Sequence, residues 1–418
     1  MFPKRLKGML DILPRESELI NFIITNFEKI VKLYGFSLIR TPILEHAELF
    51  YRSTGLTSDI VNKEMYTFYD KKERLLALRP EGTPGVIRAI IEGQLSLPQR
   101  VYYLGPMFRY ERPQKGRLRE HYQLGLEIVG EKSPYSDFEL IKIGNHFFSE
   151  INLTDTLTLV NSIGCEKCRP KFREVFLTYL KDKENLLCLD CQERKEKNPL
   201  RIFDCKQEKC QRMIKESPKV KDFLCADCQN HFNKFLSYLE NSNIKYKIDE
   251  NLVRGLDYYT KTTFEFISES LGEKISIGGG GRYDNLMKEL GGRDAPCVGF
   301  ALGLERIYYA LRENKNLNYL KENRKLMIIY DCEESFSEAE NLADLLRKEN
   351  IPCYLNPDLE NLKRQLKIAD KLDIKYVIIV GEKEREKGVY LLRDMISGEQ
   401  IEIKKDEIIN KLKKITNV

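Results

Sequence analysis

Residues 108–130 read FRYERPQKGRLREHYQLGLEIVG and form the most informative segment of the chain. It covers the end of one strand-like run, 100–111, and all of a second, 120–130, with a loop between them that holds Pro113 and Gly116. Both runs carry charged groups at intervals, whereas a strand buried on both faces would be more continuously apolar. We therefore predict two neighbouring strands of a mainly antiparallel sheet that bear ligand-binding side chains.

The loop between these strands is strongly basic. Residues 109–119 include five basic residues and one acidic residue. Guanidinium groups offer planar, bidentate donor forks that stay charged at any physiological pH, so they suit oxygen anions. A polyphosphate or an RNA backbone would fit such a loop, and a solvated basic hairpin is the alternative.

Three later runs combine arginine, glycine and aromatic residues. RGLDYYT (254–260) places an arginine and two adjacent tyrosines on a strand or tight turn. GGGGRYD (278–284) needs its glycines either for positive φ or for close approach of the backbone to a ligand, and a plain loop is the alternative. GFALGLER (299–306) predicts a small-residue strand that leads into a helix, although core packing explains its glycines equally well.

Length and composition exclude several protein classes. The chain has 418 residues, enough for two to three domains. Its 42% hydrophobic and 32% charged residues exclude general disorder, and no apolar run approaches the ~18 residues of a membrane span. The start, MFPKRLKGMLDILP, lacks the apolar core of a secretory signal, so we expect a cytoplasmic, reducing location. A net charge of +5 decides nothing about nucleic-acid partners.

Cysteine spacing and hydrophobic periodicity divide the chain. Eight of the eleven cysteines lie between Cys165 and Cys228, between the strand-like runs 156–163 and 262–267, so we interpret this region as an insertion. A helix is predicted over 17–33. After residue 325, apolar strands alternate with amphipathic helices, which predicts a small, mainly parallel α/β domain with helices on both faces. The polar segment 312–325 is the candidate linker.

Together with RPEGT (79–83), these runs resemble the histidyl-tRNA synthetase family of class II aminoacyl-tRNA synthetases. FRYERPQKGRLREHYQLGLEIVG is similar to the second class-defining motif and GFALGLER to the third, while RGLDYYT and GGGGRYDNL resemble the two histidine-specific motifs. KGMLDILP (7–14), TPILEHAELF (41–50) and NKEMYTF (62–68) match as well. The resemblance implies an α+β catalytic core in residues 1–324, with an antiparallel sheet flanked by helices. It also implies a cysteine-rich helical insert at about 165–245 and an α/β anticodon-binding domain in residues 325–418.

The family's reaction joins histidine and ATP into histidyl-adenylate and then transfers the histidyl group to the 3′ end of tRNA(His). By resemblance, Arg109 and Arg254 are catalytic and flank the α-phosphate. The implied ATP-binding residues are Arg109, Glu111 and Arg306. The residues implied around the amino acid are Glu81, Thr83, Gln123, Glu127, Tyr258 and Tyr259. Those implied to face the tRNA acceptor stem are Arg112, Gln114, Arg117 and Arg119.

Further partners follow from the same resemblance. Magnesium would accompany ATP, and members of the family work as homodimers that meet near residues 41–50. Lys363, Lys367 and Lys371 stand at helical spacing and could meet RNA phosphates, with a solvated helix face as the equal alternative. No membrane or DNA partner is expected. A regulatory paralogue of this fold typically lacks the arginine of RGLDYYT or the C-terminal domain, and this chain has both.

The insert holds its cysteines in four pairs: Cys165/Cys168, Cys188/Cys191, Cys205/Cys210 and Cys225/Cys228. Nineteen residues separate the first two pairs, the spacing of a four-cysteine zinc ribbon. Eight thiols could make two such sites. We expect structural zinc held among Cys165, Cys168, Cys188, Cys191, Cys225 and Cys228, with buried thiols or disulfides as the alternatives.

Overall fold

The computed structural model describes residues 3–55, 58, 60–112, 116–269, 275–313, 326–357 and 361–416. The chain divides into two compact units, Met1–Leu317 and Asn318–Val418. Most of the expected linker 312–325, and the expected boundary at 324/325, lie outside the described residues.

An eight-stranded sheet forms the centre of the first unit. Its strands, in spatial order, are β1 (Ser37–Leu38), β5 (Gln99–Phe108), β6 (Glu120–Val129), β11 (Cys297–Gly303), β10 (Ile275–Arg282), β9 (Thr260–Ser268), β7 (Thr156–Ser162) and β8 (Tyr246–Ile248). The six strands from β5 to β7 pair antiparallel, and only the edge strands β1 and β8 pair parallel. The predicted mainly antiparallel sheet is confirmed.

The register of the first hairpin positions the basic loop. Strands β5 and β6 pair from Gln99 opposite Val129 to Phe108 opposite Glu120, so the described residues that flank this pairing, 109–112 and 116–119, lie at one end of the sheet. Strand β11 then pairs with β6 and sets Gly303 opposite Gln123. Helix α10 (Leu304–Glu313), which follows β11 directly, therefore begins beside the same end of the sheet.

The glycine run 278–281 lies in strand β10, between β9 and β11, so the plain-loop alternative is wrong. Gly280 is paired with Phe264 on β9 and with Phe300 on β11. Glycine in the interior of a strand marks a close approach of another group. The run therefore belongs to the centre of the sheet rather than to a flexible connection.

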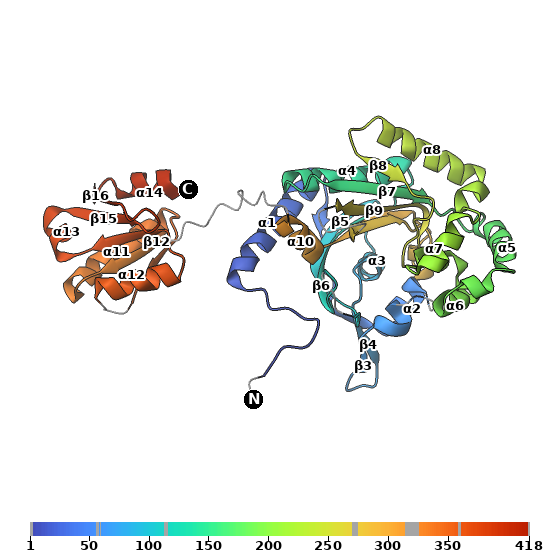
Figure 1. Ribbon diagram of the computed structural model, residues 1–418, viewed down its shortest axis with the longest axis horizontal. Helices are drawn as coiled ribbons and strands as arrows, with labels where there is room; N and C mark the ends of the chain where they lie inside the picture. The colour runs from blue at the N-terminus through green and yellow to red at the C-terminus, as the bar shows by residue number, and fades with distance from the viewer. Residues whose placement is uncertain are drawn as a thin grey trace. The chain divides into compact units, whose positions relative to one another are not determined.

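Helices cover both faces of this sheet (Figure 1). Helix α1 (Pro14–Leu33) packs against α4 (Pro134–Glu150), with the rings of Phe27 and Phe147 5.4 Å apart, and Tyr102 of β5 meets the same layer. On the other face, Val101 and Tyr103 of β5 pack with α3 (Thr83–Glu92). Alternate residues of one strand thus serve two layers.

Smaller elements complete the first unit. A three-stranded antiparallel sheet is built from β2 (Leu44–His46), β4 (Leu75–Leu78) and β3 (Thr67–Tyr69). Helix α2 (Ala47–Thr54) packs against this sheet, and α2 in turn contacts a π-helical turn at Ile60–Glu64 and α9 (Leu286–Glu289).

The insert between β7 and β8 is helical, as predicted. Its elements are α5 (Arg169–Leu180), η2 (Glu184–Leu186), α6 (Leu189–Lys197), η3 (Pro199–Asp204), α7 (Glu208–Lys215), η4 (Val220–Phe223) and α8 (Ala226–Glu240). Phe172, Phe176, Ile202 and Ile214 are among the residues of its own buried core. In Figure 1, α5, α6 and α7 lie together at one side of the sheet, and α8 runs beside α4.

The second unit contains a five-stranded sheet of β13 (Cys353–Leu355), β12 (Leu326–Tyr330), β14 (Tyr376–Val380), β15 (Val389–Asp394) and β16 (Gln400–Lys404). The first three strands are parallel, and β15 and β16 add an antiparallel hairpin. Helices α11 (Glu333–Lys348) and α14 (Ile408–Thr416) pack on one face and α12 (Leu362–Lys371) on the other. The short helix α13 (Glu382–Lys387) precedes β15. Helices on both faces were predicted.

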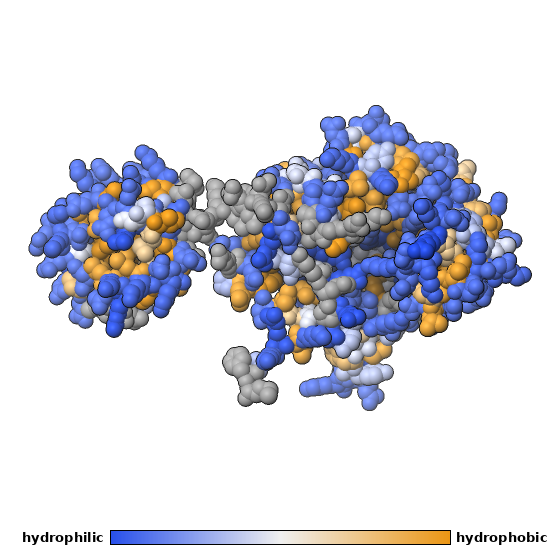
Figure 2. Space-filling model, in the orientation of Figure 1, coloured by the Kyte–Doolittle hydropathy of each residue, from blue (hydrophilic) through white to orange (hydrophobic). Residues whose placement is uncertain are grey.

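Across the residues that the structure describes, no helix has the length and apolarity needed to cross a membrane. On the face shown in Figure 2, hydrophilic side chains predominate on both units and enclose smaller hydrophobic areas.

Candidate active site

A cavity opens at the end of the central sheet where the basic loop, the 254–259 turn and the start of α10 meet. Its empty volume is about 980 Å³, open solvent at its mouth included. Side chains from segments far apart in the sequence line it, and ten of them were predicted site residues: Glu81, Thr83, Arg109, Glu111, Arg117, Gln123, Arg254, Tyr258, Tyr259 and Arg306.

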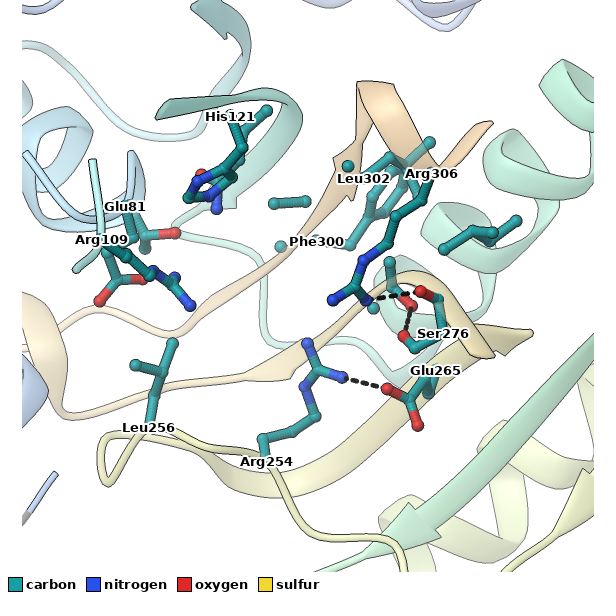
Figure 3. A pocket seen from close by; sticks show the side chains of 18 of the residues that line it. Glu81, Arg109, His121, Arg254, Leu256, Glu265, Ser276, Phe300, Leu302 and Arg306 are labelled. Atoms are coloured by element: carbon teal, nitrogen blue, oxygen red, sulfur yellow. Dashed lines mark hydrogen bonds and ion pairs between the residues drawn. The ribbon is translucent and has the colours of Figure 1, made fainter. Parts of the chain in front are cut away.

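Three arginines from three elements point into this cavity (Figure 3). Arg109, just after β5, donates from Nε to the carbonyl oxygen of Pro80 at 2.8 Å. Arg254 pairs with Glu265 at 3.2 Å, and Arg306 donates to the carbonyl oxygen of Ser276 at 2.6 Å. These contacts hold each guanidinium in place but leave like charges facing one space. The cavity therefore favours an anion with several oxygens.

The glycines of β10 make room for one of these arginines. A Cβ atom on Gly279 would lie 2.8 Å from Nη1 of Arg254 and 2.5 Å from the carbonyl oxygen of Phe264. Gly278 and Gly279 also line the cavity. As expected from the sequence, a group approaches the glycine backbone closely. The groups that do so are the neighbouring strand and Arg254, and a side chain at Gly279 would displace them.

A buried carboxylate lies beside Arg109, at one end of the cavity. Glu81 is 4% exposed and accepts hydrogen bonds from the hydroxyl groups of Tyr258 (2.8 Å) and Thr54 (3.2 Å). Burial raises its pKa, and the nearby cation of Arg109 opposes that rise. Gln123 accepts from the backbone N–H of Gly82 at 3.2 Å. This end of the cavity favours a cationic or hydrogen-bond-donating ligand.

Glu127, also predicted to bind the ligand, is not among the residues that line the cavity. It is 1% exposed, accepts from the hydroxyl of Thr83 at 2.6 Å, and accepts from the hydroxyl of Tyr283. Burial, and to a smaller degree the charge of Glu81, raise its pKa to about 8. The structure therefore places Glu127 behind the lining, where it supports two residues that do line the cavity.

The predicted acceptor-facing residues are not gathered in one place. Arg117 lines the cavity and pairs with Glu111 at 3.6 Å. Arg119 instead stacks its guanidinium over the ring of Tyr110 at 3.7 Å. Arg112 is exposed and does not line the cavity, and Gln114 lies outside the described residues.

Tyr283, Glu265 and His121 are among the cavity residues that the sequence analysis missed. Tyr283 lies within the quoted glycine-rich run but was given no role. Glu265 is the lone acidic residue of the apolar run TTFEFI, which is a usable signal. His121 had no signal in its spacing. Burial and the cations of Arg109 and Arg306 lower the pKa of His121 to about 3, so its ring is neutral.

The insert gathers its cysteines into two groups of four. Cys165 and Cys168 join Cys225 and Cys228, while Cys188 and Cys191 join Cys205 and Cys210. In each group the sulfur atoms lie within 4.8 Å of one another. The predicted combination of the first two pairs is therefore wrong, and so is the omission of Cys205 and Cys210. All eleven cysteines are described and free, so the disulfide alternative is wrong as well.

The antiparallel sheet, the arginine-bearing hairpin and the arginine at the start of α10 define the catalytic core of a class II aminoacyl-tRNA synthetase. Comparison with known proteins gives the family. Residues 8–167 and 191–307 match the family model for histidyl-tRNA synthetase, and residues 319–415 match that for an anticodon binding domain. The chain belongs to the histidyl-tRNA synthetase family.

Individual relatives agree over nearly the whole chain. A histidine–tRNA ligase of Thermodesulfovibrio yellowstonii is 43% identical, over 98% of both chains. One of Dictyoglomus thermophilum is 44% identical, over 96% of this chain and 97% of its own. The crystal structure of apo Staphylococcus aureus histidyl-tRNA synthetase matches with a TM-score of 0.81 and 32% identity, covering 99% of this chain and all of that one.

Proposed function

We propose that this chain is a histidine–tRNA ligase and that the cavity is where L-histidine and ATP react. The observation that carries the proposal is the convergence of Arg109, Arg254 and Arg306 on one cavity that also holds a buried carboxylate, Glu81, beside Arg109. A polyphosphate and an amino acid carry the complementary charges. The two would lie side by side, so that the amino-acid carboxylate attacks the α-phosphate and pyrophosphate leaves.

Catalysis then rests on position and charge. Arg109 and Arg254 would flank the α-phosphate and stabilise the negative charge that grows on its oxygens during attack, without reorganisation of solvent. Arg254 suits this task because Glu265, the ring of Tyr259 and the backbone at Gly279 hold it in place. No covalent enzyme intermediate is needed.

The remaining arginine and the carboxylates would serve the rest of ATP. Arg306 is held by the carbonyls of Ser276 and Gly116, the latter at 3.1 Å, and would reach the terminal phosphates. Glu111 would face the adenine. Magnesium enters with ATP, and the carboxylate of Glu265 at the cavity is an oxygen donor of the kind this ion takes.

Histidine would bind at the end with Glu81. The Glu81 carboxylate can pair with its ammonium group, with Thr83 and Gln123 as polar neighbours and Tyr258 and Tyr259 beside the imidazole. An amino acid without ring nitrogens would leave buried polar groups unpaired, which is the strongest basis for rejecting an analogue. Glu127 would act through Thr83 and Tyr283.

The tRNA would approach from the basic loop and the second unit. Arg112, Arg117, Arg119 and Gln114 stay candidates for the acceptor stem. Lys363, Lys367 and Lys371 are all exposed on α12, where they could contact anticodon phosphates. Exposed apolar residues on the small sheet and just before it, Ile43, Leu44, Phe68 and Tyr69, support a homodimer that meets near residues 41–50. We place the reaction in the cytoplasm.

The experiment is histidine-dependent ATP–pyrophosphate exchange with the full chain. Exchange should occur with histidine and with no other amino acid, and Arg254→Ala should slow it at least ~100-fold through lost transition-state stabilisation. Arg212, exposed on α7, is the matched control, and Arg212→Ala should leave the rate unchanged. Absence of exchange with every amino acid would refute the proposal.

A further inference from the structure

The two cysteine groups lie in different parts of the insert, one where the insert leaves the sheet and the other among its own helices. The root cluster, Cys165, Cys168, Cys225 and Cys228, joins the segment that leaves β7 to the start of α8. The inner cluster, Cys188, Cys191, Cys205 and Cys210, ties α6, η3 and α7 together. Each cluster has members that are at most 1% exposed, such as Cys168 and Cys191.

The sulfur spacing is that of a tetrahedral metal site. A Zn–S bond of about 2.3 Å puts the sulfurs of a regular tetrahedron about 3.8 Å apart. In the root cluster, Sγ of Cys165 lies 3.7 Å from that of Cys168 and 3.8 Å from that of Cys225. In the inner cluster, the Cys188 and Cys205 sulfurs are 3.7 Å apart. A disulfide would need about 2 Å.

Backbone donors already point at the sulfurs. The N–H of Cys225 lies 3.1 Å from Sγ of Cys168, and the N–H of Cys188 lies 3.3 Å from Sγ of Cys210. Such bonds stabilise negative charge on sulfur, and four thiolates together require a cation. Four soft ligands with tetrahedral spacing and no open position favour zinc in a closed, structural site.

The root cluster is joined to the end of the 254–259 turn. Gly164, next to Cys165, accepts from the backbone N–H of Lys261 at 2.8 Å. Arg169, next to Cys168, donates to the carbonyl oxygen of Tyr259. The residues on both sides of the Cys165–Cys168 turn thus hold the strand that begins just after Tyr259.

The inner cluster is joined to the middle of the same turn. Arg201 of η3, whose C-cap is Cys205, donates to the carbonyl oxygen of Gly255 and to Oδ1 of Asp257 at 3.2 Å. Asn198 donates to the same Asp257 oxygen at 2.8 Å. Val253 packs against both the core of the insert and the core beneath the cavity.

We propose that the insert binds two zinc ions, one in the root cluster and one in the inner cluster, and that they fix the 254–259 turn that carries Arg254, Tyr258 and Tyr259. The insert is a small helical module, and small modules gain much of their stability from metal or disulfide cross-links. The second half of this inference, on the turn, rests on the proposed function. The first half stands without it.

The metal half is tested by zinc analysis of the purified full chain. We expect two zinc ions per chain. Cys168→Ser/Cys228→Ser should hold one ion and Cys191→Ser/Cys210→Ser should hold one, whereas the control Cys353→Ser, outside the insert, should hold two. Replacement by Co²⁺ should give the visible bands of a tetrahedral cobalt thiolate. A wild-type chain with one ion or none overturns the two-site assignment.

The coupling half is tested in the exchange assay. Arg201→Ala leaves every cysteine in place, so it should keep two zinc ions and an unchanged far-UV circular dichroism spectrum. Because it removes a charge-assisted contact to the turn, it should raise KM for histidine at least ~10-fold. KM for ATP should change less, because Arg109 and Arg306, unlike Arg254, lie outside the 254–259 turn.

The possible failures are distinguishable. If Arg201→Ala keeps the wild-type KM for histidine, the coupling is refuted even with two ions bound. If the wild-type chain exchanges with no amino acid, the proposed function fails while the zinc count still decides the metal half.

Discussion

Glu127 offers the sharpest test of the electrostatics behind the cavity. Its carboxyl is fully buried, accepts from Thr83 and Tyr283, and has a pKa raised to about 8 by burial. Replacement by glutamine keeps the shape and imitates the neutral, protonated acid. We therefore expect Glu127→Gln to remove a pH-dependent destabilisation rather than a stabilising charge.

The sign and the magnitude follow from linkage. Because the folded pKa exceeds the ordinary value of 4.5, the contribution of Glu127 to stability is fully present below pH 4.5 and is lost as the pH rises through about 8. At about 1.4 kcal/mol per pH unit, the whole interval amounts to about 5 kcal/mol, of which about 2–3 kcal/mol falls between pH 5 and 7. Between pH 5 and 7, the unfolding free energy of the wild type should therefore fall by about 2–3 kcal/mol relative to that of Glu127→Gln.

The assay is urea unfolding of both proteins at pH 5, 6, 7 and 8. The chain contains no tryptophan, so far-UV circular dichroism is the suitable signal. All other titrating groups are common to the two proteins and cancel in the difference between their unfolding free energies. A difference that stays constant from pH 5 to 8 would refute the argument that Glu127 is neutral in the folded protein.

Three further predictions concern other parts of the molecule. Gly279→Ala should push Arg254 aside and slow pyrophosphate exchange at least ~100-fold, whereas Gly255→Ala, with nothing within 4 Å of the new Cβ, should keep the wild-type rate. Arg282→Met should cost about 3–5 kcal/mol in urea unfolding because it leaves Asp137 buried and without its main cation. A double variant with Asp137→Leu should recover part of that loss, and no recovery would contradict the pairing argument. Replacing Lys363, Lys367 and Lys371 together by glutamate should weaken tRNA charging without making the charging more sensitive to salt, while pyrophosphate exchange stays unchanged. Normal charging would exclude α12 from the RNA surface.

Residue patterns within short stretches of sequence predicted the helices and strands whose formation depends mainly on neighbouring residues. The long hairpin of β5 and β6 was predictable because charged residues interrupt an apolar strand pattern around a loop with Pro113 and Gly116. The second unit was predictable because its strands and helices alternate at short intervals. The position of Gly278–Gly281 was not, since glycines carry no side-chain periodicity. Their place was set by pairing with β9 and β11, which the local sequence does not contain.

The same distinction between local patterns and long-range packing explains which site residues could be predicted. Arg109, Arg254 and Arg306 could be named because each stands in a recognisable run, and the structure brings them together. The role of Glu127 could not be read from its strand, because whether a carboxylate faces the cavity or lies behind Thr83 depends on packing. The cysteine pairing failed for a related reason: proximity in sequence favoured Cys188/Cys191 as partners of Cys165/Cys168, but α8 returns Cys225/Cys228 to that place instead.

In the cavity, carboxylates pair with Arg254 and Arg117, whereas Arg109 and Arg306 donate to backbone carbonyl oxygens. Arg109, Arg254 and Arg306 face the same space, so bound ATP would relieve the repulsion between their charges. Beside Arg109, burial raises the pKa of Glu81, and the ammonium of a bound amino acid would favour its ionised form. Arg109 takes part in both effects, since its cation is the main charge opposing the rise of the Glu81 pKa. On the proposed assignment, binding of one substrate would therefore alter the electrostatic environment of the other, and Arg109 would lie next to both the reacting carboxylate and the α-phosphate.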